Sequence, residues 1–81
     1  MYRNAMPHFW FDVRRDDGDW SEDHEGTDLS SAEDAGREGI SLAYALAKGT
    51  PPARYISVRV RNDQPEPLLT VRLSTEVLKR A

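Results

Sequence analysis

Three segments of the chain alternate between apolar and polar residues, as expected of strands that bury one face. They span residues 8–14, 54–62 and 68–73. The residues predicted to face inward are Phe9, Phe11 and Val13 in the first segment, Ile56, Val58 and Val60 in the second, and Leu69, Val71 and Leu73 in the third. Each segment is therefore predicted to be a strand of a sheet whose one face lies on a core.

The region after the first strand predicts a tight hairpin. Residues 16–19 read DDGD, and Gly18 can adopt a positive φ at no steric cost. The return strand is predicted over residues 19–23, where Trp20 is the one apolar anchor among charged residues. Such a short, charged strand is typical of a sheet edge protected against aggregation. Residues 24–28 are predicted to form a loop.

Residues from about 32 to 48 repeat their apolar positions with helical spacing. Ser30 with Glu33 fits a capping box, Ser31 is the alternative N-cap, and Gly49 is placed to end the helix. The predicted inner stripe is Ala32, Ala35, Gly39, Leu42, Ala43 and Leu46, flanked by Ile40 and Ala47. Gly36 and Gly39 each cost the helix about 1 kcal/mol relative to alanine. A close approach of the helix to the sheet is the expected compensation.

Together these elements predict an α+β domain of order β-β-α-β-β, with one helix packed on one face of a small antiparallel sheet. A polar turn with two prolines, residues 62–67, joins the last two strands. Residues 1–6 are expected to be a flexible extension in which Met6 could be a natural start, and residues 7–81 a single domain. A single helical turn is predicted over residues 74–80.

Composition narrows the function classes. The 81 residues include no cysteine, which excludes a disulfide scaffold, thiolate zinc sites and a thiol nucleophile. No apolar run is long enough for a membrane span or a secretory signal, so a soluble cytoplasmic protein without a membrane partner is expected.

The net charge of −3 conceals two oppositely charged halves. Residues 12–34 contain ten acids against two arginines, a net of −8, and residues 48–81 contain seven bases against three acids, a net of +4. These halves are expected to balance each other within one fold or to pair between copies. The overall acidity argues against a generic DNA-binding protein.

No recognisable catalytic motif is present, and no catalytic residue, cofactor or metal site is assigned. The acidic loop lacks the spacing of a calcium-binding EF-hand, which leaves loose cation binding by its carboxylates as an open alternative. His8 and His24 are the only imidazoles, and two histidines without a third ligand make a weak metal site. A small enzyme or metal site around Asp23, His24 and Glu25 is the third-ranked hypothesis. The small sheet also offers little depth for a small-molecule pocket.

The second face of the sheet is the predicted functional surface, because one helix covers only one face. Its predicted interaction residues are His8, Trp10, Arg14, Tyr55, Arg59, Arg61, Leu68 and Arg72. Aromatic residues and arginines are enriched in protein interfaces, which favours a protein partner or self-association through this face. Binding of single-stranded nucleic acid, with stacked bases and paired phosphates, is the alternative. A third interpretation is a solvated face on which arginine stems cover the rings.

The chain also resembles a group of short bacterial proteins of unknown function. The shared features are the start MPHFWFDVR at residues 6–14, a turn at Gly18, the DHEG stretch at residues 23–26, Leu29, the helix start over residues 32–36, and the strands YISVRV and LLTV at residues 55–60 and 68–71. Residues 62–67 depart from the group, whose members tend to have an Asp-Gly hairpin there. The resemblance implies no known activity. The element order is remotely similar to HicB-like antitoxin domains, which implies by analogy a regulatory role.

Overall fold

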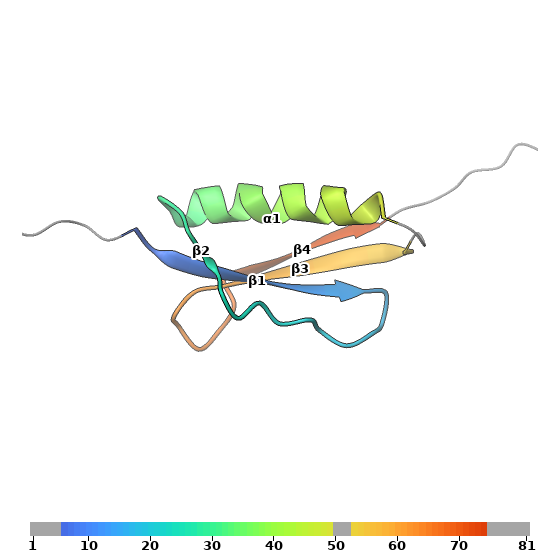
Figure 1. Ribbon diagram of the computed structural model, residues 1–81, viewed down its shortest axis with the longest axis horizontal. Coiled ribbons are helices and arrows are strands. Elements are labelled where there is room, and N and C mark those ends of the chain that lie inside the picture. The colour runs from blue at the N-terminus through green and yellow to red at the C-terminus, as the bar shows by residue number, and fades with distance from the viewer. Residues whose placement is uncertain (1–5, 50–52, 75–81) are drawn as a thin grey trace, which may run out of the picture.

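The computed structural model describes residues 6–49 and 53–74, and within them the chain forms one helix and four strands (Figure 1). In chain order the elements are β1 (His8–Arg15), β2 (Thr27–Asp28), α1 (Ala32–Ala47), β3 (Tyr55–Arg61) and β4 (Leu69–Ser74). The strands form one antiparallel sheet in the order β2-β1-β3-β4, and α1 lies across one face of it. The predicted α+β class and element order are confirmed.

The core lies between α1 and the sheet, where the alternation predicted it. Phe9, Ile56, Val58 and Val60 are at most 2% exposed, and Phe11 is also buried. Val13, Val71 and Leu73 are partly buried and pack against this cluster. Leu69 was predicted to face inward but stays 38% exposed, because β4 is the outermost strand of the described sheet.

The helix approaches the sheet closely at Gly39, as its small residues predicted. A Cβ atom at Gly39 would lie 3.1 Å from Cγ2 of Val60 and 3.6 Å from Cγ2 of Val71, so there is no room for a larger residue without movement. The neighbouring buried residues are Ala35 and Ala43. The buried stripe is narrower than predicted, because Ala32 and Ile40 lie at its margins and are exposed.

Local signals fix both ends of α1. Ser31 is the N-cap, with an extended backbone and a side-chain oxygen that accepts from the Asp34 N–H at 3.1 Å. The alternative capping residue is therefore the correct one, while the Ser30 hydroxyl donates to the Asp34 carboxylate. The helix ends at Ala47, just before Lys48 and Gly49, as predicted.

The predicted return strand over residues 19–23 is wrong. Only one bridge remains there, in which the N–H groups of Val13 and Ser21 each donate to the other residue's carbonyl. The strand that pairs with the start of β1 is Thr27–Asp28, which had been predicted as loop, with Asp28 opposite His8 and Thr27 opposite Phe9. The intervening acidic residues lack the alternation that would sustain a longer ladder.

In the turn after β1, the residue with positive φ is not the predicted one. The residue with positive φ is Asp16, at 50°, rather than Gly18. The Asp16 carboxylate holds this conformation by accepting the N–H groups of Arg54 at 2.7 Å and Tyr55 at 3.1 Å. The first turn is thereby tied to the start of β3.

The polar turn of residues 62–67 connects β3 to β4 as predicted, with the Gln64 N–H donating to the Asn62 side chain. Ser74, the predicted cap of a last helical turn, is the final residue of β4, and the rest of that turn lies outside the described residues, as do residues 1–5 of the predicted extension. In the described ranges, no helix has the length and apolar character needed to cross a membrane.

Candidate interaction face

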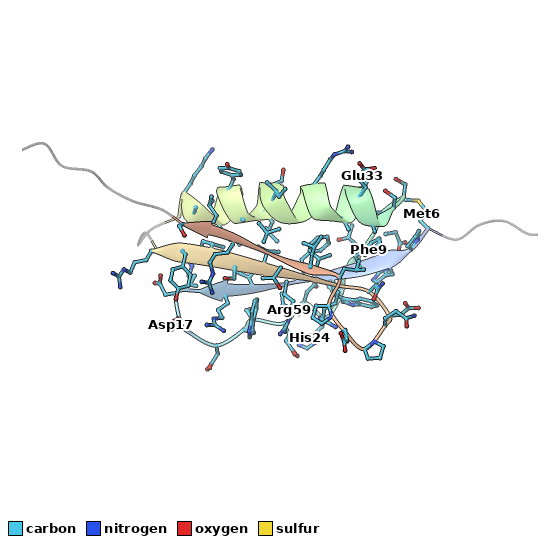
Figure 2. The ribbon with its side chains drawn as sticks, turned by 180° about the vertical axis from the view of Figure 1, so that it is seen from behind. Met6, Phe9, Asp17, His24, Glu33 and Arg59 are labelled. Atoms are coloured by element: carbon cyan, nitrogen blue, oxygen red, sulfur yellow. The ribbon has the colours of Figure 1, made fainter. Side chains whose placement is uncertain are left out.

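The sheet face opposite α1 carries Arg14, Arg59, Arg61 and Arg72 and three aromatic rings, those of Trp10, Trp20 and Tyr55. Figure 2 shows Arg59 on this side, together with Asp17 and His24 from the loop after β1, whereas Phe9 lies between the sheet and the helix. The loop between β1 and β2 also passes on this side (Figure 1). The face is therefore not bare, as the sequence had suggested, but partly covered by the acidic segment of the chain.

Asp12 lies at the centre of this face and is fully buried. In the β1–β3 register it stands directly opposite Arg59, whose Nε donates to Oδ2 at 2.8 Å. Arg61 donates from Nε to Oδ2 at 2.6 Å and from Nη2 to Oδ1 at 3.1 Å. Burial raises the pKa of Asp12, but hydrogen bonds from Arg61, the Asp23 N–H and Arg59 outweigh it and lower this pKa below 3.8. Asp12 is thus a buried, ionised carboxylate with partners for both oxygens.

Asp23 fastens the acidic loop to the edge of β1. Its carboxylate accepts the N–H of Phe11 at 3.1 Å, where a neighbouring strand would normally offer a carbonyl. It also accepts the N–H groups of Glu25 and Gly26 at 3.0 Å each, and Gly26 has a φ of 73° that suits glycine. Burial raises the pKa of Asp23, but these N–H groups lower it overall below 3.8.

Trp20 lies over the arginines rather than in a strand. Its ring centroid is 4.3 Å from the guanidinium carbon of Arg59 and 5.5 Å from that of Arg14. On β1, the Trp10 ring similarly has the guanidinium of Arg61 at 5.6 Å. We call the set Trp10, Arg14, Trp20, Arg59 and Arg61 the arginine–tryptophan face. All five side chains are partly exposed.

His8 borders this face and holds β2 and its preceding loop. Nδ1 lies 2.5 Å from the Asp28 carboxylate and Nε2 lies 2.8 Å from the Glu25 carbonyl, so an imidazolium would donate to both acceptors. The hydrogen bonds to Asp28 and Glu25 raise the pKa of His8 above 6.5. The ring also makes an edge contact with Trp10 at 4.7 Å between centroids.

Tyr55 and Arg72 form a second, smaller cluster. The guanidinium of Arg72 lies 4.4 Å from the centroid of the Tyr55 ring, and its Nε is 3.4 Å from the Ser57 hydroxyl. The Tyr55 hydroxyl donates to Asp17 of the acidic loop. Leu68, the remaining predicted interaction residue, immediately precedes β4 and is 41% exposed, outside these two clusters.

A model of a domain of unknown function, DUF6894, matches residues 8–74. The chain belongs to the DUF6894 family. Comparison with curated proteins finds no match, and comparison with solved structures finds none. Membership agrees with the expected family of unknown function, whereas the remote likeness to HicB-like domains stays a prediction.

Three residues of this DUF6894 domain are central to the face but were absent from the predicted set: Asp12, Trp20 and Asp23. Asp12 had been assigned to the correct side of β1, and its position among aromatic and basic residues was the available signal. The sequence offered no comparable signal for Trp20 and Asp23, because their positions depend on an irregular loop rather than on a periodic element.

The DUF6894 domain shows no arranged metal site in residues 6–49 and 53–74, where no three His, Asp or Glu side chains are grouped to hold an ion. A hollow of about 440 Å³ lies between β1, the following turn and the end of α1, and is wide open to solvent. The residues that line it are Val13, Arg15, Gly18, Asp19, Ser21 and Leu46.

Proposed function

We propose that this DUF6894 chain is a small, non-enzymatic binding module that recognises a protein partner through the arginine–tryptophan face. The observation that carries this proposal is the stacking of two partly exposed indole rings on guanidinium groups that Asp12 holds in place. Tryptophan and arginine are the residues that most often dominate binding energy in protein interfaces. The regulatory role implied by the remote HicB-like analogy belongs to the same proposal.

The rigidity of this surface supports binding. An arginine that becomes ordered on binding loses side-chain entropy of roughly 0.5–1.5 kcal/mol, which weakens the complex. Here Arg59 and Arg61 are already fixed by the buried carboxylate, and the rings rest on them. A partner therefore meets flat apolar surfaces and polar groups that are ordered before it arrives.

The charge balance favours a protein over a nucleic acid. Arg59 and Arg61 direct hydrogen bonds inward to Asp12, and Arg14 pairs with Asp17 at 3.6 Å. Phosphate binding draws its strength from cations that replace counterions along the backbone. The carboxylates of Asp12 and Asp17 already offset part of this positive charge, so the face suits a partner with exposed apolar side chains better than a row of phosphates.

The decisive experiment is affinity capture from the cells that naturally express the chain, with quantitative mass spectrometry. Wild-type bait is compared with Trp10→Ala and Trp20→Ala, and with Glu38→Ala on the exposed side of α1 as the matched control. We expect at least one protein to be retained by the wild type and by Glu38→Ala, but lost about tenfold or more with either tryptophan variant, since a hot-spot residue contributes about 2 kcal/mol or more. Circular dichroism confirms that each variant is folded.

Two results would overturn the proposal. One is that every captured protein is retained equally by the tryptophan variants. The other is binding of a labelled single-stranded oligonucleotide at about 50 mM salt, lost in the tryptophan variants, since electrostatic binding is strongest at low salt. The second result would move the function to nucleic-acid recognition.

A further inference from the structure

The two edges of the sheet are finished in different ways. Along β1, the outer edge is occupied by β2, by the Asp23 carboxylate at the Phe11 N–H and by the bridge from Ser21 to Val13. On the other side, no described strand lies beyond β4. The strand is six residues long, contains no proline, and Arg72 is its single charge. Features that commonly protect an edge against pairing are thus concentrated on β1.

The helix presents apolar side chains above this open edge. Ile40 is 47% exposed and Tyr44, one turn later, is 57% exposed. Gly36, one turn before Ile40, faces β4, since a Cβ there would lie 3.6 Å from Cδ2 of Leu69. Residues four apart lie on the same side of a helix, so these three positions define the flank of α1 on the β4 side.

We propose that a second copy of this chain pairs with the β4 edge. The two β4 strands run antiparallel about a two-fold axis perpendicular to the sheet. The two sheets then form one continuous sheet, with both helices on one face. We refer to this arrangement as the β4 dimer.

The side chains of β4 select the register of this pairing. An axis perpendicular to the sheet keeps the helix faces of both copies on the same side. Such an axis must pass between two identical residues, which near the middle of β4 are Thr70, Val71 or Arg72. An axis at Arg72 would place like charges directly opposite each other, which is unfavourable. An axis at Val71 pairs Leu69 with Leu73 of the other copy on the helix face, and Thr70 with Arg72 on the opposite face. This register alone matches all three apolar residues of the strand with apolar partners.

The position of α1 fits the same arrangement. Gly39 contacts both Val60 on β3 and Val71 on β4, so the helix lies above the gap between these strands. With adjacent strands about 4.8 Å apart, the two helices of the β4 dimer would be separated by two strand spacings, or about 10 Å. Packed helices are typically about 8–10 Å apart. The two copies therefore contact each other both through their sheets and through their helices.

Gly36 provides an independent reason to favour a second copy. Within one chain, a Cβ at Gly36 makes only ordinary contact with Leu69, yet the glycine costs the helix about 1 kcal/mol. With the axis at Val71, close to Gly39, the helices cross near Ile40 and run antiparallel. Tyr44 of one copy then approaches Gly36 of the other. The missing side chain leaves space for the tyrosine ring.

The β4 dimer would place both arginine–tryptophan faces on the same side, opposite the two helices. It would thus offer two equivalent binding surfaces to one partner. This inference stands apart from the proposed function, because the dimer contacts are Gly36, Ile40, Tyr44 and β4, none of which belongs to that face.

Sedimentation velocity of the full chain, from low to high micromolar concentration, tests the association directly. We expect the wild type to shift to a dimer, and Ile40→Glu and Tyr44→Glu to remain monomeric. Gly36→Ala is expected to weaken the dimer about tenfold or more while leaving the monomer folded. Because a glycine-to-alanine change favours the helix itself, this loss cannot be attributed to unfolding.

Cross-linking tests the geometry, since the natural chain has no cysteine. Ile40→Cys is expected to form a disulfide-linked dimer on mild oxidation, whereas Glu38→Cys, on the other flank of α1, is not. A wild type that remains monomeric at the highest concentration overturns the proposal, as does a dimer that survives Ile40→Glu or cross-links through Glu38→Cys. Trp20→Ala is expected to dimerise normally, so failure of the partner-binding proposal remains distinguishable.

Discussion

The two faces of the sheet are held by different interactions. Beneath α1, apolar residues pack closely against a helix surface of glycine and alanine, with Gly39 against Val60 at the tightest point. On the opposite face, a buried carboxylate gathers two arginines and the main chain of an acidic loop. Small changes in side-chain shape cost an apolar core little stability, whereas separating a buried charge from its partners costs more. The second face is therefore the more fragile one.

The largest expected effect is that of removing the buried charge. Asp12→Ala leaves Arg59 and Arg61 without their carboxylate and the Asp23 N–H without its acceptor. Because the two guanidinium groups left behind are partly exposed, we expect a loss of about 2–4 kcal/mol of unfolding free energy, less than for a fully buried unpaired charge. Urea denaturation measures the loss, with Glu38→Gln on the helix surface as control, expected to change stability by less than about 0.5 kcal/mol. A loss for Asp12→Ala as small as the control would contradict the comparison.

A smaller effect is expected at the closest contact of the helix face. Gly39→Ala places a Cβ 3.1 Å from Val60, and overpacking of this kind costs about 1–3 kcal/mol, offset by about 1 kcal/mol of helix propensity. The net loss of unfolding free energy is therefore up to about 2 kcal/mol. Gly36→Ala, where the Cβ has room, is the matched control and is expected to stabilise the isolated chain. Denaturation at a concentration where the chain is monomeric compares the two variants. Equal stability would show that the helix face is not closely packed at Gly39.

The smallest effect concerns the pH dependence at the border of the arginine–tryptophan face. The pKa of His8 is raised above its unfolded value of 6.5 by Asp28 and the Glu25 carbonyl. The imidazolium therefore contributes its full stability below about pH 6.5, and this contribution is lost as pH rises through the folded-state pKa. We expect the stability difference between wild type and His8→Gln to be constant from about pH 5 to 6 and to shrink at higher pH. A difference that grows above neutral pH would contradict this sign.

A second pH effect has the opposite sign and a separate range. The pKa values of Asp12 and Asp23 are lowered below 3.8, so their stabilisation is present above that value and is lost as pH falls through the folded-state pKa. Proton NMR of the His8 ring follows the first transition. Tryptophan fluorescence, which reports on Trp10 and Trp20 on their arginines, follows the acidic one.

The sequence was sufficient for the regular elements and insufficient for the acidic loop. Alternation located β1, β3 and β4, since each directs every second residue toward the same core, although β4 buries its apolar residues only in part. The loop has no such period: Asp23 replaces a strand carbonyl with its side chain, and β2 is only two residues long. A side chain that replaces the carbonyl of a neighbouring strand leaves no repeating pattern in the sequence.

The candidate face was predicted in part for a related reason. Its three arginines and Trp10 were assigned correctly to the side away from the core, because strand parity fixes the side of each residue in a strand. The alternation of side chains along a strand does not show which strands are neighbours in the sheet. Only the adjacency of β1 and β3 places Asp12 opposite Arg59, and that contact makes the arginines a partly neutralised, ordered surface.

The residues of this contact lie far apart in the chain, and this separation determines when the surface forms. Asp12 is separated from Arg59 by 47 residues and from Arg61 by 49. During synthesis, β1 and the acidic loop leave the ribosome long before β3, and closing so long a loop depends on the whole fold. The surface is therefore completed late, together with the sheet. A partner that reads Trp20 above Arg59 would distinguish a finished chain from a nascent or partly unfolded one.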